Sequence, residues 1–229
     1  MNKQQILTTT MLVLLLAALS TIGPFTVVTV LPAMGSIGKT FGTSAEQTQL
    51  VISLYSICFG LMNLLHGAVS DAIGRKKVII VALSCYSVAA LACAFSTSLT
   101  MLIAARMVQG LSGGAGAIVS RAIIRDCFEG KQAQKIMAYV TMIFSLAPAI
   151  APVIGGKLSS STAGWQGVFL FLSVFGLLLL ISSWIKLSRV YPNEPKKPIS
   201  FSFLFSSYKQ LLYKPAFVLL SCALTFSFV

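Results

Sequence analysis

Arg106 and Gln109 are polar residues within an apolar run that reads Leu102-Ile-Ala-Ala-Arg106-Met-Val-Gln109-Gly110. A charged side chain inside a membrane span costs about 2.5–3.5 kcal/mol on insertion scales, so by default it faces a cavity or a polar partner. Gln109 lies three residues further on and therefore shares a helix face with Arg106. We take Arg106, Gln109 and Gly110 as candidates for substrate binding or ion coupling. The alternative is an arginine that snorkels to the membrane interface.

A second charged group lies between two apolar runs, in the segment Gly67-Ala-Val-Ser-Asp71-Ala-Ile-Gly74-Arg75-Lys76-Lys77. Gly67 permits close approach of a neighbouring helix, and Gly74 permits a tight turn. Asp71 can accept hydrogen bonds from a helix amino terminus or pair with Arg75. Such a group could latch a gate, whereas the alternative is that these cations only set the membrane topology.

Asp126 follows a later apolar run and is expected on the same membrane side as Arg75. We therefore predict one charge cluster of Asp71, Arg75 and Asp126. The alternative is a local pair of Asp126 with Arg125 or Lys131, which would contribute little in water.

Prolines and glycines also stand at helical spacing inside an apolar run, as Pro148, Pro152, Gly155 and Gly156. Proline removes a backbone hydrogen bond and glycine permits bending, so these residues predict a bent membrane helix.

The elements that must position these residues are membrane-spanning helices. The chain has 229 residues, of which 56% are hydrophobic and only 10% charged. A span needs roughly 20 apolar residues to cross the hydrocarbon layer. Hydropathy predicts six such spans, at 8–32, 47–69, 78–97, 101–122, 135–156 and 166–187. We expect an all-α membrane protein with a six-helix bundle over residues 1–190.

The segment after the bundle holds several prolines and charges, which favour an extended chain in water. We interpret residues 191–215 as a linker and 216–229 as the start of a seventh span, too short to cross the bilayer and therefore a sign of truncation.

Charge supports one orientation of these spans. The net charge is +12, and the basic residues cluster in short segments without the aromatic interleaving of a nucleic-acid-binding face. Only Lys39 and Lys157 would lie opposite a cytoplasmic amino terminus, so the positive-inside rule predicts that terminus in the cytoplasm.

Several classes of chemistry are disfavoured. The five cysteines show no spacing typical of zinc or of a disulfide framework, and the only histidine is His66. None of the five acidic residues lies well inside a predicted span, which counts against a membrane-embedded enzyme.

The quoted segments resemble motifs of the major facilitator superfamily, especially its Bcr/CflA branch of drug exporters. The resemblance runs across all six spans and is also carried by Arg121-Ala-Ile-Ile-Arg125-Asp126-Cys-Phe-Glu129-Gly130. It implies a bundle of major facilitator type that works with a second six-helix half, in the cell inner membrane. It also implies efflux of drugs or small amphipathic molecules, driven by a proton gradient and without a bound cofactor.

The sequence departs from this branch at two places. Val28 and Val30 stand where the branch usually carries an aspartate and a tyrosine, and Ala151 replaces a glycine of the antiporter motif. The first span therefore lacks the proton- or substrate-sensing group that the resemblance implies. Two alternatives stay open: a metabolite transporter of the same fold, and a half-transporter fragment that does not transport by itself.

Overall fold

A computed structural model of the chain describes residues 3–190 and residue 213, and the regular structure there is helical. The elements are α1 (Lys3–Val30), η1 (Leu31–Ala33), α2 (Met34–Phe41), α3 (Ala45–Ile73), α4 (Arg75–Ala94), α5 (Leu99–Gly113), α6 (Ala115–Cys127), α7 (Gly130–Ser159) and α8 (Gly164–Val190). The predicted linker and seventh span lie outside the described residues, apart from Tyr213, so their assignment stays a prediction.

Six segments of the described chain are long and apolar enough to cross a membrane: Thr10–Phe41, Ala45–Ile73, Arg75–Ala94, Leu99–Cys127, Gly130–Ser159 and Gly164–Leu187. The prediction of an all-α protein with six spans is confirmed. The first span continues beyond its expected end, because the short 3-10 helix η1 at Pro32 leads directly into α2. The fourth span is divided at Gly114 into α5 and α6.

Short turns connect the spans, and local sequence explains them. Gly42 ends α2 with a φ of 63°, a conformation that costs glycine little. The side chain of Ser44 then accepts a hydrogen bond from the backbone of Gln47, whose side chain bonds back to Ser44 and completes a capping box. Gly74, with a φ of 106°, alone separates α3 from α4, as the glycine in the charged segment predicted.

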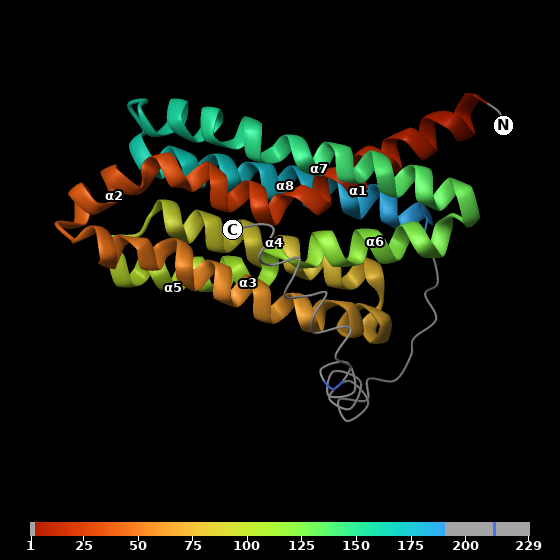
Figure 1. Ribbon diagram of the computed structural model, residues 1–229, viewed down its shortest axis with the longest axis horizontal. Coiled ribbons are helices and arrows are strands. Elements are labelled where there is room, and N and C mark those ends of the chain that lie inside the picture. Colours follow the sequence, from red (N-terminus) through yellow and green to blue (C-terminus); the bar gives the residue numbers. More distant parts are fainter. Residues whose placement is uncertain (1–2, 191–212, 214–229) are drawn as a thin grey trace.

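Helix α1 runs through the centre of the bundle, where it packs against α6, α7 and α8. On the other side of the bundle, α4 packs against α8 and α5, and α5 packs against α3 (Figure 1). The apolar side chains form two buried clusters, one at each end of the spans. Spans α3 and α7 are the least buried, so each leaves an apolar face uncovered.

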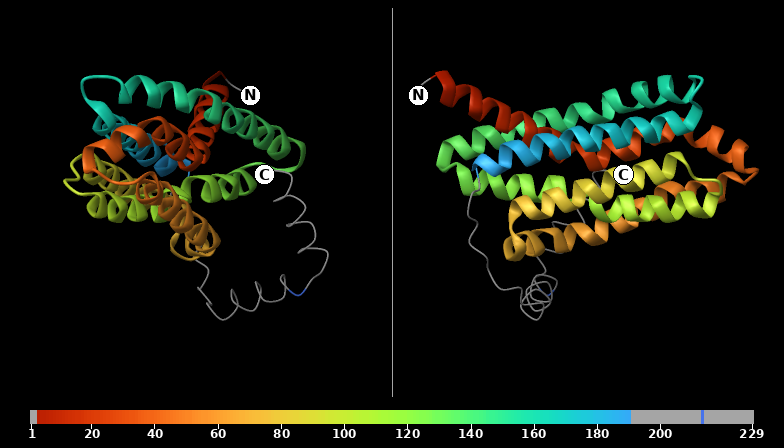
Figure 2. Two further views of the ribbon diagram at one scale, coloured as in Figure 1. Left: turned by 60° about the vertical axis from the view of Figure 1, so that its left-hand side comes forward. Right: turned by 180° about the vertical axis from the view of Figure 1, so that it is seen from behind.

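The two ends of the bundle differ in charge. The α3–α4 turn, the α6–α7 turn and the end of α8 lie together at one end, which is the right-hand end in Figure 1 (see also Figure 2). Arg75, Lys77, Arg121, Lys131 and Lys186 belong to the segments at this end. Lys39 and Lys157 belong to the segments at the other end. We refer to the first end as the basic end.

Helix α7 packs closely against α1 at Gly155, one of the two adjacent glycines in α7. Pro148 and Pro152 both lie inside α7, which remains one helix across them. A Cβ atom at Gly155 would overlap the backbone carbonyl of Thr29 in α1, whereas a Cβ at Gly156 would meet nothing within 4 Å. Membrane helices gain packing energy from such close approach, because lipid provides no hydrophobic driving force between them.

This asymmetry generates a paired test. Gly155→Ala is expected to lower the melting temperature of the purified protein, because overpacking against a backbone costs about 1–3 kcal/mol. Gly156→Ala is the matched control and should leave the melting temperature unchanged or slightly raised. Gel filtration after heating in detergent measures both, and equal melting temperatures for the two variants would contradict this packing.

Candidate site around Arg106

Arg106 lies inside the bundle and is fully buried, with 0% of its surface exposed. It belongs to α5, whose first turn is capped by the side chain of Ser98. The guanidinium Nε donates a hydrogen bond to the backbone carbonyl of Val51 in α3, at 3.2 Å. Nη1 donates to Oε1 of Gln109 at 2.7 Å, so the two side chains contact each other on one helix face.

Two aromatic rings enclose the guanidinium. Its central carbon lies 4.0 Å from the ring centroid of Tyr55 in α3 and 5.9 Å from that of Phe169 in α8. A desolvated cation over an aromatic face gains about 2 kcal/mol. The rings therefore replace part of the hydration that Arg106 loses on burial.

The charge of Arg106 has no carboxylate partner among residues 3–190, where the ion pairs involve Arg75 instead. Its Nη2 atom and Nε2 of Gln109 are buried without a hydrogen-bond partner in this part of the chain. An unsatisfied buried donor costs about 1–3 kcal/mol, and more when it is charged. Of the two environments expected for Arg106, a cavity or a polar partner, this conformation shows polar partners, and the side chain is fully enclosed.

Three further polar residues belong to this site, and the sequence interpretation missed them. The Tyr55 hydroxyl donates to the backbone carbonyl of Gly23 in α1 at 3.1 Å. Thr26 of α1 and Tyr86 of α4 share a hydrogen bond of 2.5 Å between their hydroxyl groups. The sequence feature that could have revealed these residues is a tyrosine or threonine inside an apolar span, because a buried hydroxyl group needs a hydrogen-bond partner. These bonds join α1 to α3 and to α4.

Gly110 allows α5 to approach α3 at the site. A Cβ atom there would overlap the backbone carbonyl of Tyr55, so a larger residue would push the helices apart. A Cβ at Gly113 would lie 2.9 Å from the Tyr55 hydroxyl. The small residues next to Arg106 therefore set the distance at which its guanidinium reaches Val51 and Tyr55.

The structure also brings together the three charged residues at the basic end. Arg75 pairs with Asp71 one turn earlier along the chain, and its Nε lies 3.2 Å from a carboxylate oxygen of Asp126 in α6. Nη1 of Arg75 also donates to the hydroxyl of Ser70 at 2.6 Å. Arg75 has only 18% of its side chain exposed, whereas both carboxylates are more than 40% exposed.

Other predicted residues lie apart from these two groups. Lys76 stacks over the Trp184 ring of α8 at 5.4 Å, and Gly67 faces Ile118 of α6. His66 is buried with its Nδ1 atom unpartnered among the described residues. Within the same part of the chain, no group of three or more His, Cys, Asp or Glu residues is placed to hold a metal ion.

A helical membrane bundle with an ionisable residue inside one of its spans is typical of proteins that move substrates or ions across a membrane. The sequence profile of the Major Facilitator Superfamily matches residues 11–229, and the chain belongs to this family. Multidrug resistance protein D of Escherichia coli (strain K12) is 30% identical over 90% of this chain and 51% of its own length. The bicyclomycin resistance protein homolog of Haemophilus influenzae is 31% identical over 96% of this chain and 54% of its own.

Solved structures show the same fold. An inward-facing bacterial homolog of the human lysosomal transporter Spinster superposes with a TM-score of 0.73 at 17% identity, over 85% of this chain and 44% of that protein. The expected resemblance to drug-resistance members of the superfamily is confirmed by the two curated relatives. The chain spans about half the length of these relatives.

The geometry at Arg106 predicts that lysine cannot replace it. Arg106→Lys keeps the charge but loses the planar group that stacks on Tyr55 and bonds to Val51 and Gln109. We expect a lower melting temperature in detergent, by an amount that corresponds to about 1–3 kcal/mol. Arg121→Lys, on an exposed arginine of α6, is the control and should melt like the unaltered protein. If the two variants melt alike, the buried contacts do not stabilise the bundle.

Proposed function

We propose that this chain is one six-helix half of a secondary active transporter in the cell inner membrane. It exports drugs or other small amphipathic molecules in exchange for protons, together with a second six-helix half. Substrate binds near the bilayer midplane between the two halves, and the halves rock around it. The drug-resistance names of two relatives and the shared fold support this proposal.

The single observation that carries the proposal is the enclosed Arg106. A buried cation in a membrane protein marks a functional site by default, because its cost in stability must be offset by a role. The hydrogen bonds to Val51 and Gln109 and the stacking on Tyr55 hold it in place, while Nη2 keeps its donor capacity. A conformation that opens the site would offer this group to an acceptor on the substrate or on the second half.

Arg106 can then couple binding to movement. A ligand shifts a conformational equilibrium only by the difference between its affinities for the two states. In the enclosed state described here, Arg106 bonds to Val51 and Gln109 and stacks on Tyr55, while its Nη2 atom has no acceptor among the described residues. In an open state, Arg106 gains a new acceptor. Protonation of this acceptor removes its charge and weakens its bond to Arg106, so the conformational equilibrium shifts back towards the enclosed state.

The amino terminus lies in the cytoplasm in this proposal. Arginine and lysine residues concentrate at the end of the bundle that holds the α3–α4 and α6–α7 turns. Cytoplasmic segments of membrane proteins carry such an excess of basic residues. The basic end is thus assigned to the cytoplasmic side.

The Arg75 cluster serves as a cytoplasmic latch. Arg75 joins the end of α3, through Asp71, to the end of α6, through Asp126. Gly67 and Gly74 allow the close approach and the turn that place it, and Lys76 anchors the same turn on α8. Release of this cluster would let the helix ends separate when the cytoplasmic side opens.

The α7 residues Pro148, Pro152, Gly155 and Gly156 are assigned to a bend that accompanies this opening. Each proline leaves a backbone carbonyl without its usual hydrogen-bond partner, so bending the helix at these positions breaks fewer hydrogen bonds than elsewhere.

Dye efflux tests the transport proposal. Cells that express the protein together with its second six-helix half should export a fluorescent cationic dye, and a protonophore should abolish the export. Arg106→Ala should reduce the initial efflux rate by at least about tenfold, which corresponds to the loss of about 1.4 kcal/mol in coupling. Arg121→Ala, which removes an exposed arginine from α6, is the control and should export normally.

Amounts of folded protein in the membrane must be equal, as judged by fluorescence-detected gel filtration. An Arg106→Ala variant that exports at the unaltered rate would contradict the role assigned to Arg106. Export that is insensitive to the protonophore would contradict proton exchange.

The latch generates a separate test. Asp71→Asn and Asp126→Asn each remove one partner of Arg75 and should change the initial efflux rate by up to about fivefold, because a half-exposed ion pair contributes about 0.2–1 kcal/mol. Glu129→Gln removes an acid at the same end that forms none of the ion pairs seen in residues 3–190, and it should leave the rate unchanged. A uniform effect of all three variants would indicate that general surface charge, not the latch, matters.

A further inference from the structure

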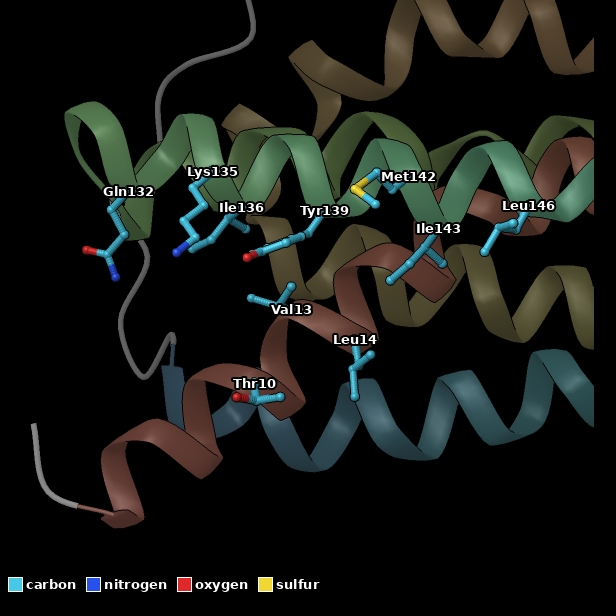
Figure 3. Close-up of a pocket in the computed structure, with 10 residues that line it drawn as sticks. All are labelled: Thr10, Val13, Leu14, Gln132, Lys135, Ile136, Tyr139, Met142, Ile143 and Leu146. Atoms are coloured by element: carbon cyan, nitrogen blue, oxygen red, sulfur yellow. The ribbon is translucent and has the colours of Figure 1, made fainter.

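A groove of about 560 Å³ runs between α1 and α7, starting at the basic end (Figure 3). This volume lies within the usual range of small-molecule and cofactor sites, about 300–1,000 Å³. One wall is formed by Val13 and Leu14 of α1, and the other by Met142, Ile143 and Leu146 of α7. Several of these apolar side chains are exposed, so the groove needs an apolar occupant.

The polar residues of the groove gather at one end. Figure 3 shows Thr10 on α1, and Gln132 and Lys135 on α7, towards the start of both helices, while Met142 and Leu146 lie further along. Tyr139 lies between the two parts, with its hydroxyl group directed into the groove. The groove is therefore amphipathic along its length, with a cationic entrance and an apolar channel.

Lys135 gives the entrance its charge. Its ammonium group lies 5.9 Å from the ring centroid of Tyr139, one turn further along α7. Both ion pairs within residues 3–190 are formed by Arg75, and neither involves Lys135. An exposed ammonium group above an apolar groove is complementary to an anion that carries a hydrocarbon chain.

We propose that this groove binds an anionic phospholipid from the surrounding bilayer. The phosphate would pair with Lys135 and accept hydrogen bonds from Gln132 and Tyr139, while an acyl chain would lie between Leu14 and Met142. Basic pockets between membrane helices bind acidic lipid headgroups by this combination of charge and apolar contact. The tyrosine adds an amphipathic ring at the level of the headgroups.

Such a lipid would contact α7, the helix to which the proposed function assigns a bend. It would rest on α7, one of the two least buried spans, and on α1, which packs against α7 through Gly155. A bound lipid would stabilise the arrangement of α1 and α7 in which the groove exists. The inference concerns binding, so it can be tested independently of transport and of its direction.

Native mass spectrometry of the purified full chain in detergent tests the proposal. Phosphatidylglycerol and phosphatidylcholine are added separately at equal concentrations, and the bound fraction of each is measured. Phosphatidylglycerol should be retained preferentially. Lys135→Gln should weaken its binding about fivefold, the factor for one lysine near an anionic lipid surface.

Two further variants separate the groove from general surface effects. Lys131→Gln removes the same charge one turn earlier on α7, outside the groove lining, and should leave binding unchanged. Met142→Trp, on an exposed position, should fill the apolar channel and reduce the retention of phosphatidylglycerol while Lys135 is intact. Circular dichroism and gel filtration must show that all variants remain folded.

Equal retention of both lipids by the unaltered protein would overturn the proposal. Equal losses in Lys131→Gln and Lys135→Gln would also overturn it, because they would indicate diffuse attraction to the basic end. If Met142→Trp binds phosphatidylglycerol normally, the acyl chain does not lie in this groove and the proposed site is wrong.

Discussion

The close approach of helix backbones is the constraint on which this structure depends. In lipid, apolar side chains gain nothing by leaving the solvent, so helices associate through tight packing and hydrogen bonds. Gly110 places α5 on the backbone of α3, Gly116 places α6 on the carbonyl of Leu19 in α1, and Gly155 places α7 on α1. These contacts bring the polar groups of different helices within hydrogen-bonding distance of one another.

The polar interior follows from that packing. Arg106 reaches a backbone carbonyl of α3 because Gly110 lets α5 and α3 meet. Tyr55 of α3 reaches the carbonyl of Gly23 in α1, where a Cβ atom would overlap the ring of Phe59. The site is therefore built from backbone carbonyls, hydroxyls and aromatic faces around one cation. An environment of this kind holds a charge without neutralising it, and the proposed function makes this charge available to a ligand in another conformation.

The charged residues are distributed unevenly between the two ends of the bundle. Basic residues lie mainly at one end of the bundle, where the Arg75 cluster joins three helix ends and Lys135 borders a groove. By the positive-inside rule, such an excess of positive charge would orient the chain in the membrane, and the same charges would attract anions. A topological signal and a binding surface can thus share residues.

Hydropathy and local motifs were sufficient to predict six spans, the tight turn at Gly74 and the family. They were insufficient where structure departs from a simple apolar run. The continuation of the first span through η1 and α2 was missed because Pro32 and the less apolar residues after it ended the hydropathy signal. The interruption at Gly114 was missed because a single glycine among several carries no distinctive pattern.

The sequence by itself therefore determined the number of membrane spans in the described part of the chain, their charge asymmetry and the residue types available for chemistry, because these depend on composition and on spacing along one helix. Only the tertiary structure decided which faces meet. It enclosed Arg106 between Tyr55 and Phe169, brought Asp126 to Arg75 across 51 residues, and turned Gly155 rather than Gly156 towards α1. The physical reason is that helix periodicity places residues on a face, whereas the partner of that face depends on the packing of all six spans together.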